Sequence, residues 1–376
     1  MDRYRPTFLE FFAGAGLARL GLEGRFDCVF ANDFDPMKAA AYRQNVDDDH
    51  FVDGDVWGLN AKTLPATDMA WASFPCQDLS LAGARKGLNA PRSGAFWGFW
   101  RLIEAMGDKA PPILSLENVP GLLTSRGGRD FTALVATLAD AGYRVGGLVA
   151  DAAWFTPQSR PRLFLIAMKG RIPGAVLRGS ANPLYHPKSL VQAVDRLDEK
   201  SRLAWCWWSP PEPPKRNLSL IDVLDPAPPE DLWRSETQLE ALITQMAPLH
   251  RARLDAVLGS PEPSVGAVFR RIRRENGERV QRAEIRFDGL AGCLRTPAGG
   301  SSKQLLIVVE NGEAHLRPVS AREAARLMGV PDTFVMPPGE TAGLKVMGDG
   351  VCVPVVSWLA DGLLSPLAGT LETRAA

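Results

Sequence analysis

The sequence has no excess charge of either sign, few cysteines and histidines, and no long unbroken hydrophobic run. Its 43 basic residues balance 43 acidic ones, so net charge predicts no partner, and a polyanion would have to meet a local basic patch. Five cysteines, an odd number, with no recognisable signal peptide, favour free thiols in a reducing cytoplasm. The apolar stretches are too short and too often broken to cross a bilayer. We therefore expect a cytoplasmic protein that does not enter a membrane.

The composition is that of a globular chain with more than one domain. Its 376 residues exceed the roughly 150 that are typical of a single domain. Hydrophobic residues make up 45% of the chain and charged residues 23%, which excludes disorder over most of its length. The 35 glycines and 30 prolines are too few for a low-complexity chain.

The first half of the chain alternates short apolar runs with stretches of helical periodicity. Strands are expected at residues 7–12, 27–31, 69–73, 113–116, 143–150 and 163–168. Residues 96–106 and 131–141 have the apolar spacing of helices. Strands interleaved with helices at this spacing predict an α/β fold with a parallel sheet.

The chain changes character after Met168. Residues 205–214 read Trp-Cys-Trp-Trp-Ser-Pro-Pro-Glu-Pro-Pro and cannot form a regular helix, because proline lacks a donor and clashes with the preceding turn. Arginines then crowd residues 251–286. Further on we expect a strand at 305–309, a helix at 321–328, and a strand, turn and helix over 351–364 that return to the first domain.

The segment Phe12-Ala13-Gly14-Ala15-Gly16 lies where the first strand turns into the first helix. Glycines there let a ligand approach the backbone, and a helix N-terminus favours an anionic group. Asp33 is placed to bond ribose hydroxyls, Phe34 to lie against an adenine, and Asp55 to supply another acid. The alternative is that the glycines form only a tight turn. Because Arg19 stands where a nicotinamide site needs its third glycine, adenosine with a small charged tail fits better.

Cys76 follows a strand and a proline, in the segment from Ser73 to Ser80. This position puts the thiol in a loop over the carboxyl edge of the sheet, where open α/β folds bind ligands. A thiolate is an effective nucleophile, and a helix N-terminus lowers the pKa of a thiol. The alternative, a buried inert cysteine, is the better reading for most isolated cysteines. That reading fits the other four cysteines: Cys28, Cys206, Cys293 and Cys352.

Glu117 ends the next apolar run, Ile113 to Leu116, in the same way, although an acidic residue at such a junction is often only an N-cap. Alternation on an extended backbone sends Gln158, Arg160 and Arg162 to one face. Both guanidiniums would then converge on one site, which would need a carboxylate or a phosphate to balance their charge. Solvated arginines are the alternative.

These motifs, in this order, resemble those of the C5-cytosine DNA methyltransferases of the bacterial restriction-modification type. The matching blocks are the Phe-Ala-Gly-Ala-Gly loop, Asn32-Asp33, Gly54-Asp55-Val56, Pro75-Cys76-Gln77, Arg92-Ser93-Gly94, Glu117-Asn118-Val119, Gln158-Ser159-Arg160-Pro161-Arg162, Arg317-Pro318 with Arg322-Glu323 and Arg326-Leu327, and Gly348-Asp349-Gly350-Val351. The likeness covers about residues 4–168 and 288–362, and one motif alone is weak whereas this many in order is strong evidence.

The resemblance implies a Rossmann-like S-adenosylmethionine-dependent methyltransferase domain with a smaller, irregular target-recognition domain. The expected boundaries are residues 1–175 for the first part of the catalytic domain, 176–315 for target recognition, and 316–376 for a hinge and return. The partner implied is double-stranded DNA. The enzyme either protects DNA beside a cognate restriction endonuclease, a partner by function and not necessarily by contact, or works alone. The protein is expected to be a monomer in the cytoplasm, associated with the nucleoid.

The resemblance also implies a mechanism. The thiolate of Cys76 adds to C6 of cytosine, which turns C5 into a nucleophile that accepts the methyl group of S-adenosylmethionine. Negative charge develops at N3 and O2, where a protonated Glu117, whose pKa must be raised, acts with Arg162 and Arg160. No metal is needed, and the four histidines show no ligand spacing.

The implied cofactor site contains residues from most of the blocks. They are Phe12, Ala13, Gly14, Ala15, Gly16, Asp33, Phe34, Asp55, Val56, Pro75, Ala95, Asp349 and Val351. Asp349 departs from the family, which usually has Asn there. An extra carboxylate near the cofactor would favour a positive sulfonium or alter the choice of cofactor analogue, unless it points away.

A base inside a duplex cannot reach such a pocket, so the target nucleotide must be flipped out. Phosphate contacts supply the energy, and residues 251–286 are their expected source. The residues expected at DNA are Gln77, Ser80, Gln158, Arg270, Arg271, Arg273, Arg274, Ser301, Ser302, Lys303 and Gln304. The alternative for the arginines is a solvated face paired with Glu275, Glu278 and Glu284.

Three other functions compete with a DNA (cytosine-5)-methyltransferase. A tRNA cytosine-5 methyltransferase would share the catalytic fold, but the long central domain and the Pro-Cys-Gln context resemble the duplex-DNA enzymes. A non-catalytic DNA-binding homologue would not need Cys76, Glu117 and Arg162. A nucleotide-dependent oxidoreductase would need a complete glycine pattern.

Overall fold

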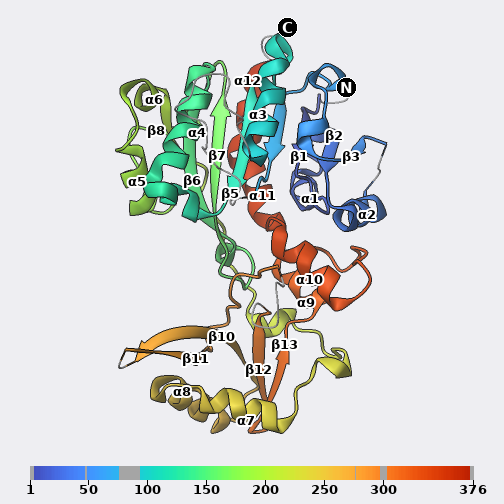
Figure 1. The fold of residues 1–376 in the computed structure, drawn as a ribbon, viewed down its shortest axis with the longest axis vertical. Coiled ribbons are helices and arrows are strands. Elements are labelled where there is room, and N and C mark those ends of the chain that lie inside the picture. Colours follow the sequence, from blue (N-terminus) through green and yellow to red (C-terminus); the bar gives the residue numbers. More distant parts are fainter. Residues whose placement is uncertain (1–3, 47–48, 76–93, 276, 297–302, 373–376) are drawn as a thin grey trace. The chain divides into compact units, whose positions relative to one another are not determined.

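The computed structural model describes residues 4–46, 49–75, 94–275, 277–296 and 303–372. The chain divides into two compact units (Figure 1). The first unit comprises Met1–Asp151, Pro161–Glu212 and Val355–Ala376. The second unit comprises Ala152–Arg160 and Pro213–Pro354. Each unit is therefore assembled from segments that are distant in the sequence.

A nine-stranded sheet forms the centre of the first unit, in the order β3-β2-β1-β4-β5-β7-β6-β9-β8. The strands are β1 (Thr7–Phe11), β2 (Asp27–Asp33), β3 (Phe51–Asp53), β4 (Met69–Ala72), β5 (Ile113–Asn118), β6 (Arg144–Asp151), β7 (Pro161–Met168), β8 (Leu177–Arg178) and β9 (Trp205–Trp208). Strands β3, β2, β1, β4 and β5 are parallel, as the alternation predicts. The expectation of a wholly parallel sheet is wrong, because β7 is antiparallel to both β5 and β6. The segment Ala152–Arg160 between β6 and β7 is too short for a parallel crossover.

Helices cover both faces of this sheet (Figure 1). They are α1 (Leu17–Leu22), α2 (Pro36–Asn45), α3 (Ala95–Ala105), α4 (Arg129–Asp140), α5 (Lys188–Val194), α6 (Glu199–Ala204), α11 (Val353–Leu359), a π-helical turn (Ala360–Leu364) and α12 (Ser365–Glu372). The main core joins Leu9 and Phe11 of β1 and Leu114 of β5 to Phe99 of α3 and Leu134 of α4. Burial of this apolar face holds the strand ends in register.

The second unit is built on a four-stranded antiparallel sheet in the order β11-β10-β12-β13. Its elements are β10 (Ser264–Glu275), β11 (Glu278–Arg286), β12 (Leu305–Glu310), β13 (Glu313–Pro318), α7 (Glu236–Thr244), α8 (Pro248–Leu258), α9 (Ala321–Leu327) and α10 (Glu340–Asp349). Leu242 of α7 and Leu254 of α8 pack on Val268, Ile285 and Ile307 of the sheet. Within the arginine-rich stretch, β10 and β11 form a long β-hairpin, while Arg251 and Arg253 lie in α8. The strand and helix expected at 305–309 and 321–328 are confirmed.

The C-terminal region differs from the expectation of a strand, turn and helix over 351–364. It is helical from Val353, and Leu359, Leu363 and Leu364 are fully buried. Residues Glu340–Leu371 are also long and apolar enough, by length and composition, to cross a membrane, contrary to our expectation about apolar stretches. The most apolar part of this region is 67% buried inside the protein. A buried core helix has the same length and composition as a membrane span, and this region also fits that description.

Candidate active site

Most of the expected catalytic-domain residues lie at one edge of the sheet. The parallel strands β1, β2, β4 and β5 all end there, so the segments after them, which begin at Phe12, Phe34 and Ser73, share that edge with Glu117 near the end of β5. Strand β7 runs the opposite way and therefore begins at the same edge, with Arg162. Arg162 reaches this edge because β7 is antiparallel to the strands whose carboxyl ends lie there.

Glu117 and Arg162 form an ion pair across this edge. The distance from Arg162 Nε to Glu117 Oε1 is 3.1 Å, and both side chains are largely buried. Asn118 pairs with Leu163 in the β5–β7 register, which sets the two charged residues on neighbouring strands. An acid and a guanidinium are thus held side by side at the strand ends.

Asn118 fixes the start of the loop that leads to Cys76. Its side-chain amide donates to the carbonyl of Phe74 at 2.9 Å, and its Oδ1 accepts the N–H of Val119. Asn118 is buried, and its place in a motif is the only signal of this role in the sequence. Cys76, Gln77 and Ser80 lie outside the described residues, as do Ser301 and Ser302.

The glycine segment turns sharply after β1. Phe12, Gly14 and Gly16 all have positive φ angles, of 57°, 59° and 81°. A Cβ on Gly16 would lie 3.1 Å from the Tyr42 ring, whereas a Cβ on Gly14 would meet nothing within 4 Å. The loop therefore requires glycine at position 16 for packing and at 14 for backbone conformation, since φ near +60° disfavours other residues.

Asp33 holds this loop in place. Its Oδ2 accepts the N–H of Gly14 at 2.8 Å, and its Oδ1 accepts the N–H of Asp35 at 2.9 Å. The neighbouring Phe34 is 67% exposed, which is unusual for a large aromatic side chain. A carboxylate and an open ring thus stand beside the glycine loop.

The remaining expected cofactor residues of the first unit take different positions. Asp55 caps the short 3-10 helix Val56–Gly58 by accepting the N–H of Trp57, and Val56 is buried. Ala13 and Ala15 of the loop are also buried. Pro75 is exposed after β4, and Ala95 begins α3.

A buried charged cluster lies beneath the loop, and sequence reasoning missed it. Glu10 of β1 is 1% exposed, and burial raises the pKa of its carboxyl to about 8 against the opposing effect of the Arg19 cation. Arg19 donates to the Tyr42 hydroxyl at 3.0 Å, and that hydroxyl lies 3.1 Å from His50 Nε2. The available signal was a lone acidic residue inside the apolar run from Phe8 to Phe11.

Arg160 and Gln158 lie inside the second unit, contrary to the expectation that they face a ligand with Arg162. Arg160 is 2% exposed and donates to the carbonyls of Leu294, Gly348 and Gly350 at 2.7–2.9 Å. Gln158 is fully buried and accepts the N–H of Leu294. The two guanidiniums expected to converge therefore have separate partners, because the chain passes between units at Pro161.

The last expected block also has internal partners. The carboxylate of Asp349 accepts a hydrogen bond from the hydroxyl of Thr296, and Val351 is buried. Because Arg160 holds the carbonyls on either side of Asp349, this residue is set in a fixed backbone segment.

Several expected DNA contacts differ in how exposed their polar groups are. Arg271 and Arg273 form ion pairs with Glu284, as the alternative of a paired face predicts. Arg270 is exposed, and Lys303 is half-buried before β12. Gln304 uses its amide internally, donating to the carbonyl of Val268 and accepting the N–H of Gly292. The side-chain amide of Gln304 is thus used inside the protein and does not point toward a ligand.

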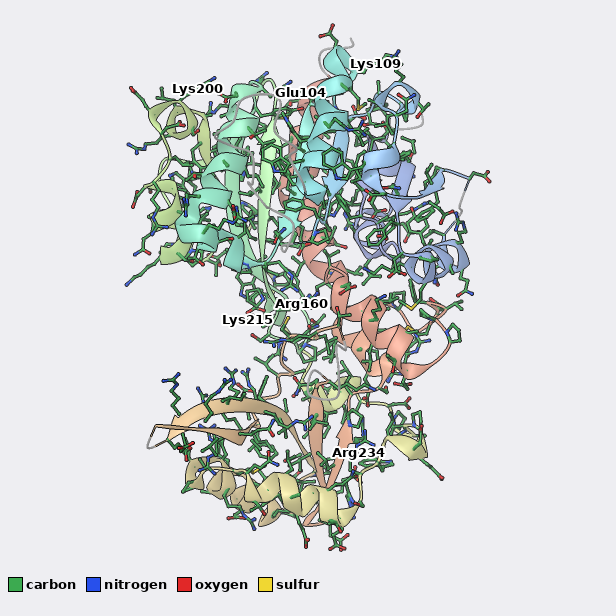
Figure 2. The ribbon with its side chains drawn as sticks, in the orientation of Figure 1. Glu104, Lys109, Arg160, Lys200, Lys215 and Arg234 are labelled. Atoms are coloured by element: carbon green, nitrogen blue, oxygen red, sulfur yellow. The ribbon has the colours of Figure 1, made fainter. Side chains whose placement is uncertain are left out.

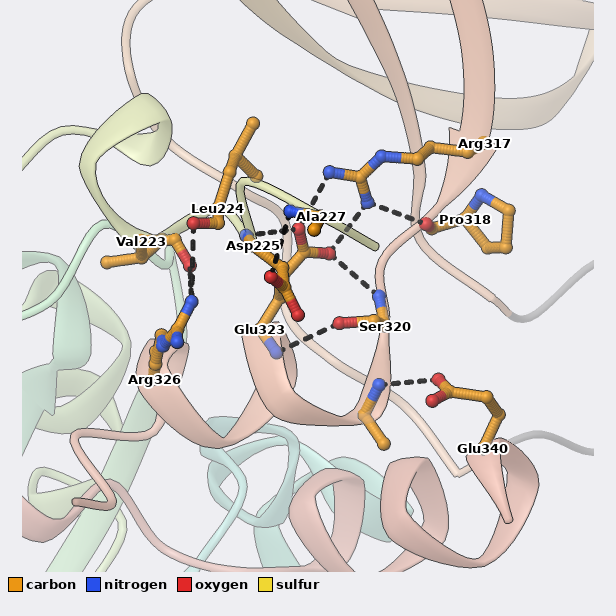
Figure 3. Close-up of polar contacts among 11 residues, drawn as sticks. Val223, Leu224, Asp225, Ala227, Arg317, Pro318, Ser320, Glu323, Arg326 and Glu340 are labelled. Carbon is orange, nitrogen blue, oxygen red and sulfur yellow. Dashed lines mark hydrogen bonds and ion pairs between the residues drawn. The ribbon is translucent and has the colours of Figure 1, made fainter. Parts of the chain in front are cut away.

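A buried ion pair organises the helical part of the second unit (Figure 3). Both Nη atoms of Arg317 donate to Glu323 at 2.7 Å, and each residue is at most 1% exposed. Glu323 also accepts the backbone N–H of Ser320 and of Asp225. It therefore joins α9, β13 and the segment before α7, a role the sequence did not reveal.

The comparison with known protein families decides the identity of this fold and site. The family model described as C-5 cytosine-specific DNA methylase matches residues 6–365, nearly the whole chain. The chain belongs to the C-5 cytosine-specific DNA methylase family. The resemblance drawn from the motifs is confirmed, and this methylase is a DNA (cytosine-5)-methyltransferase.

Curated relatives of the methylase match along most of its length. Type II methyltransferase M.Bsp6I of Bacillus sp. (strain RFL6) is 34% identical over 94% of this chain and 96% of its own. Type II methyltransferase M.MspI of Moraxella sp is 27% identical over 94% of this chain and 69% of its own. Type II methyltransferase M.HhaI of Haemophilus parahaemolyticus is 24% identical over 96% and 94%.

Solved structures share the fold of the methylase. The S. pombe Dnmt2 methyltransferase has a TM-score of 0.59 and 19% identity over 98% of this chain and all of that one. A putative DNA modification methyltransferase encoded within an E. coli prophage has a TM-score of 0.56 and 16% identity over 98% and 99%. The expected fold class, a Rossmann-like α/β methyltransferase, is therefore confirmed.

Proposed function

We propose that this methylase transfers a methyl group from S-adenosylmethionine to C5 of a cytosine flipped out of a specific duplex DNA sequence, through a transient bond between Cys76 and C6. The observation that carries this proposal is the Glu117–Arg162 pair at the sheet edge where the Cys76 loop starts. An acid and a cation held there suit a reaction in which a pyrimidine ring takes up negative charge.

The residues around the glycine loop fit S-adenosylmethionine. This cofactor supplies, when bound, a methyl group on a positively charged sulfur. Asp33 would bind the ribose hydroxyls with lone pairs left by its two backbone bonds, and the exposed ring of Phe34 would cover the adenine. The rest of the proposed site is the set named from the sequence: Phe12, Ala13, Gly14, Ala15, Gly16, Asp55, Val56, Pro75, Ala95, Asp349 and Val351.

Cys76 would act as the nucleophile. Its thiolate would form a bond to C6, which opens the C5–C6 double bond and makes C5 electron-rich. C5 would then take the methyl group as the sulfur–methyl bond breaks, and S-adenosylhomocysteine would be the leaving group. Loss of the C5 proton then restores the double bond as the sulfur leaves. The tie between Asn118 and Phe74 supports this role, because it fixes the loop two residues before Cys76.

Glu117 and Arg162 would stabilise the charge that develops at N3 and O2. In the structure the two side chains pair with each other. When the base enters the site, Glu117 would donate a proton to N3 and Arg162 would face the O2 atom. Arg160 and Gln158 would act as positioning residues, because both hold backbone of the second unit.

The second unit would bind the duplex, with Arg270, Arg271, Arg273, Arg274 and Lys303 supplying cations. Relatives named as type II methyltransferases support a place beside a cognate restriction endonuclease. We further propose that the protein acts as a monomer in the cytoplasm, on nucleoid DNA. Flipping of the base follows from the need to bring C6 of a cytosine, which is stacked inside the duplex, to the sulfur of Cys76.

The deciding experiment supplies labelled S-adenosylmethionine with mixed-sequence duplex DNA and, separately, with transfer RNA. Label on C5 of cytosine in one duplex sequence is expected. Label only on RNA would indicate the tRNA alternative, and binding of DNA without label would indicate a non-catalytic homologue.

A second experiment tests the covalent bond. Duplex DNA with 5-fluorocytosine in the methylated position should trap an adduct that mass spectrometry locates at Cys76. Cys206→Ala, a change at a buried cysteine of β9, should still form the adduct, whereas Cys76→Ala should not. An adduct on another side chain would contradict the proposal.

A further inference from the structure

The two faces of the β10–β11 hairpin differ in charge. Directly paired residues share a face, so the register puts Arg271 and Arg273 on one face with Glu284. On that face Arg271 and Arg273 share the carboxylate of Glu284, and Arg282 pairs with Glu275. The opposite face carries Arg270, which lies beside the core residue Ala283 in the register, and its outer part holds Arg274 and Arg279 without an acidic residue.

The face of Arg270 continues into a cavity beside α7. This cavity has a volume of about 290 Å³, and its floor is apolar, with Leu242 of α7 and Leu305 of β12. Three cations line it: Arg270, Lys303 and Arg234, the last labelled in Figure 2. Its other polar lining residues are Gln238 of α7 and Gln245, which follows that helix, and no carboxylate of the described residues lines it. A site with this charge suits an anion.

The backbone that carries two of these residues is anchored to the sheet. The N–H of Arg234 donates to the carbonyl of Leu316 in β13 at 2.8 Å. Lys303 is followed by Gln304, whose side chain donates to the carbonyl of Val268 and accepts the N–H of Gly292. Both long side chains therefore start from fixed points beside the cavity.

We propose that this cavity binds one backbone phosphate of the DNA duplex, held by Arg234, Arg270 and Lys303. The inference rests on the proposed function, because it takes duplex DNA as the partner. It adds Arg234, which sequence reasoning did not single out. A phosphate contact positions the duplex but carries no sequence information.

The test measures the salt dependence of DNA binding for wild-type protein and for Arg234→Gln, Lys303→Gln and the double variant. Two duplexes are compared: one that the protein methylates, and one of A·T pairs only, which holds no target. Lys200→Gln is the matched control, since Lys200 forms an exposed ion pair with Asp140 in the first unit. Urea unfolding of each variant shows that the second unit is intact.

Loss of one phosphate contact should lower the slope of log Kd against log salt by about 1 in the double variant, equally on both duplexes. The slopes of the two single variants should lie between those of the wild type and the double variant. Lys200→Gln should keep the wild-type slope. A folded double variant with the wild-type slope, or a loss confined to the methylated duplex, would overturn the inference. If the wild-type protein failed to methylate any duplex, the proposed function itself would fail, which is a separate outcome.

Discussion

Glu117 and Arg162 lie 45 positions apart in the sequence, and the antiparallel β5–β7 pairing brings their side chains to 3.1 Å. At the residue scale, this pair can take part in catalysis if its two side chains exchange their mutual contact for contacts with the base. Both side chains are largely buried, so the pairing is not weakened by solvent as a surface ion pair would be.

We expect Glu117→Gln to lower the methyl-transfer rate by about 10²–10³-fold, because the amide cannot supply a proton to N3 of the base. Affinity for S-adenosylmethionine should be nearly unchanged. Single-turnover kinetics and equilibrium dialysis measure the two quantities, with Glu104→Gln on the exposed side of α3 as the control. A rate equal to wild type would remove Glu117 from the mechanism.

Asp349 offers a second residue-scale prediction. Its carboxylate accepts the Thr296 hydroxyl, and an asparagine oxygen would do the same. Asp349→Asn should therefore change cofactor affinity by far less than Cys76→Ala changes turnover, for which we expect a loss of about 10³-fold or more. A near-complete loss of activity in Asp349→Asn would contradict this.

Glu10 makes stability depend on pH. Burial raises the pKa of its carboxyl from the usual 4.5 to about 8, in the presence of Arg19 and Asp33. Between these values the folded state keeps a proton that the unfolded state loses, so stability should fall as pH rises from about 5 to 8. Urea unfolding should show a decline on the order of a few kcal/mol that Glu10→Gln largely removes.

The matched control for this change is Glu104→Gln, which removes an exposed carboxylate from α3. It should leave the pH dependence of unfolding as in the wild type. If Glu10→Gln and Glu104→Gln gave the same slope between pH 5 and pH 8, burial of Glu10 would not be its cause.

At the scale of elements, the Arg317–Glu323 pair holds α9 to β13 and to the segment at Asp225 (Figure 3). Removing one member leaves a buried charge without its partner. We expect Glu323→Ala to destabilise the second unit by about 3–5 kcal/mol in urea unfolding. Asp332→Ala, which breaks an exposed pair with Arg326, should cost no more than about 1 kcal/mol. Equal costs would show that burial does not matter here.

At the scale of the whole molecule, the C-terminal helices belong to the first unit although they follow the second unit in the chain. Leu359, Leu363, Leu364 and Leu367 are all fully buried. Each contributes roughly 1.5–3 kcal/mol. Their sum approaches the entire stability of a typical protein, about 5–15 kcal/mol.

A chain that ends at Pro354 should therefore fail to form a stable first unit. Circular dichroism and limited proteolysis should show loss of helix and rapid cleavage within residues 1–212. A chain that ends at Glu372 is the control and should behave as the wild type. Resistance of the shorter chain to protease would contradict the prediction.

The sequence alone determined the fold class, the family, and the shared sheet edge of the glycine loop, Asp33, Pro75 and Glu117. These follow from local information, because apolar runs define strands and parallel strands end at one edge. The direction in which distant strands pair does not follow from local patterns, and so the antiparallel β7 was not predicted. The fully helical stretch after Val353 was not predicted either, because a short apolar run suits a buried strand and a buried helix equally.

Only the tertiary structure decided the partners of individual polar side chains. Arg160 and Arg162 look equivalent along an extended strand, yet one holds backbone of the second unit and the other pairs with Glu117. The burial of Glu10, the Arg317–Glu323 pair and the cavity at Arg234 depend likewise on segments brought together from distant positions. The physical reason is that burial and charge pairing are properties of the packed chain, whereas turn, strand and helix preferences belong to the residues themselves.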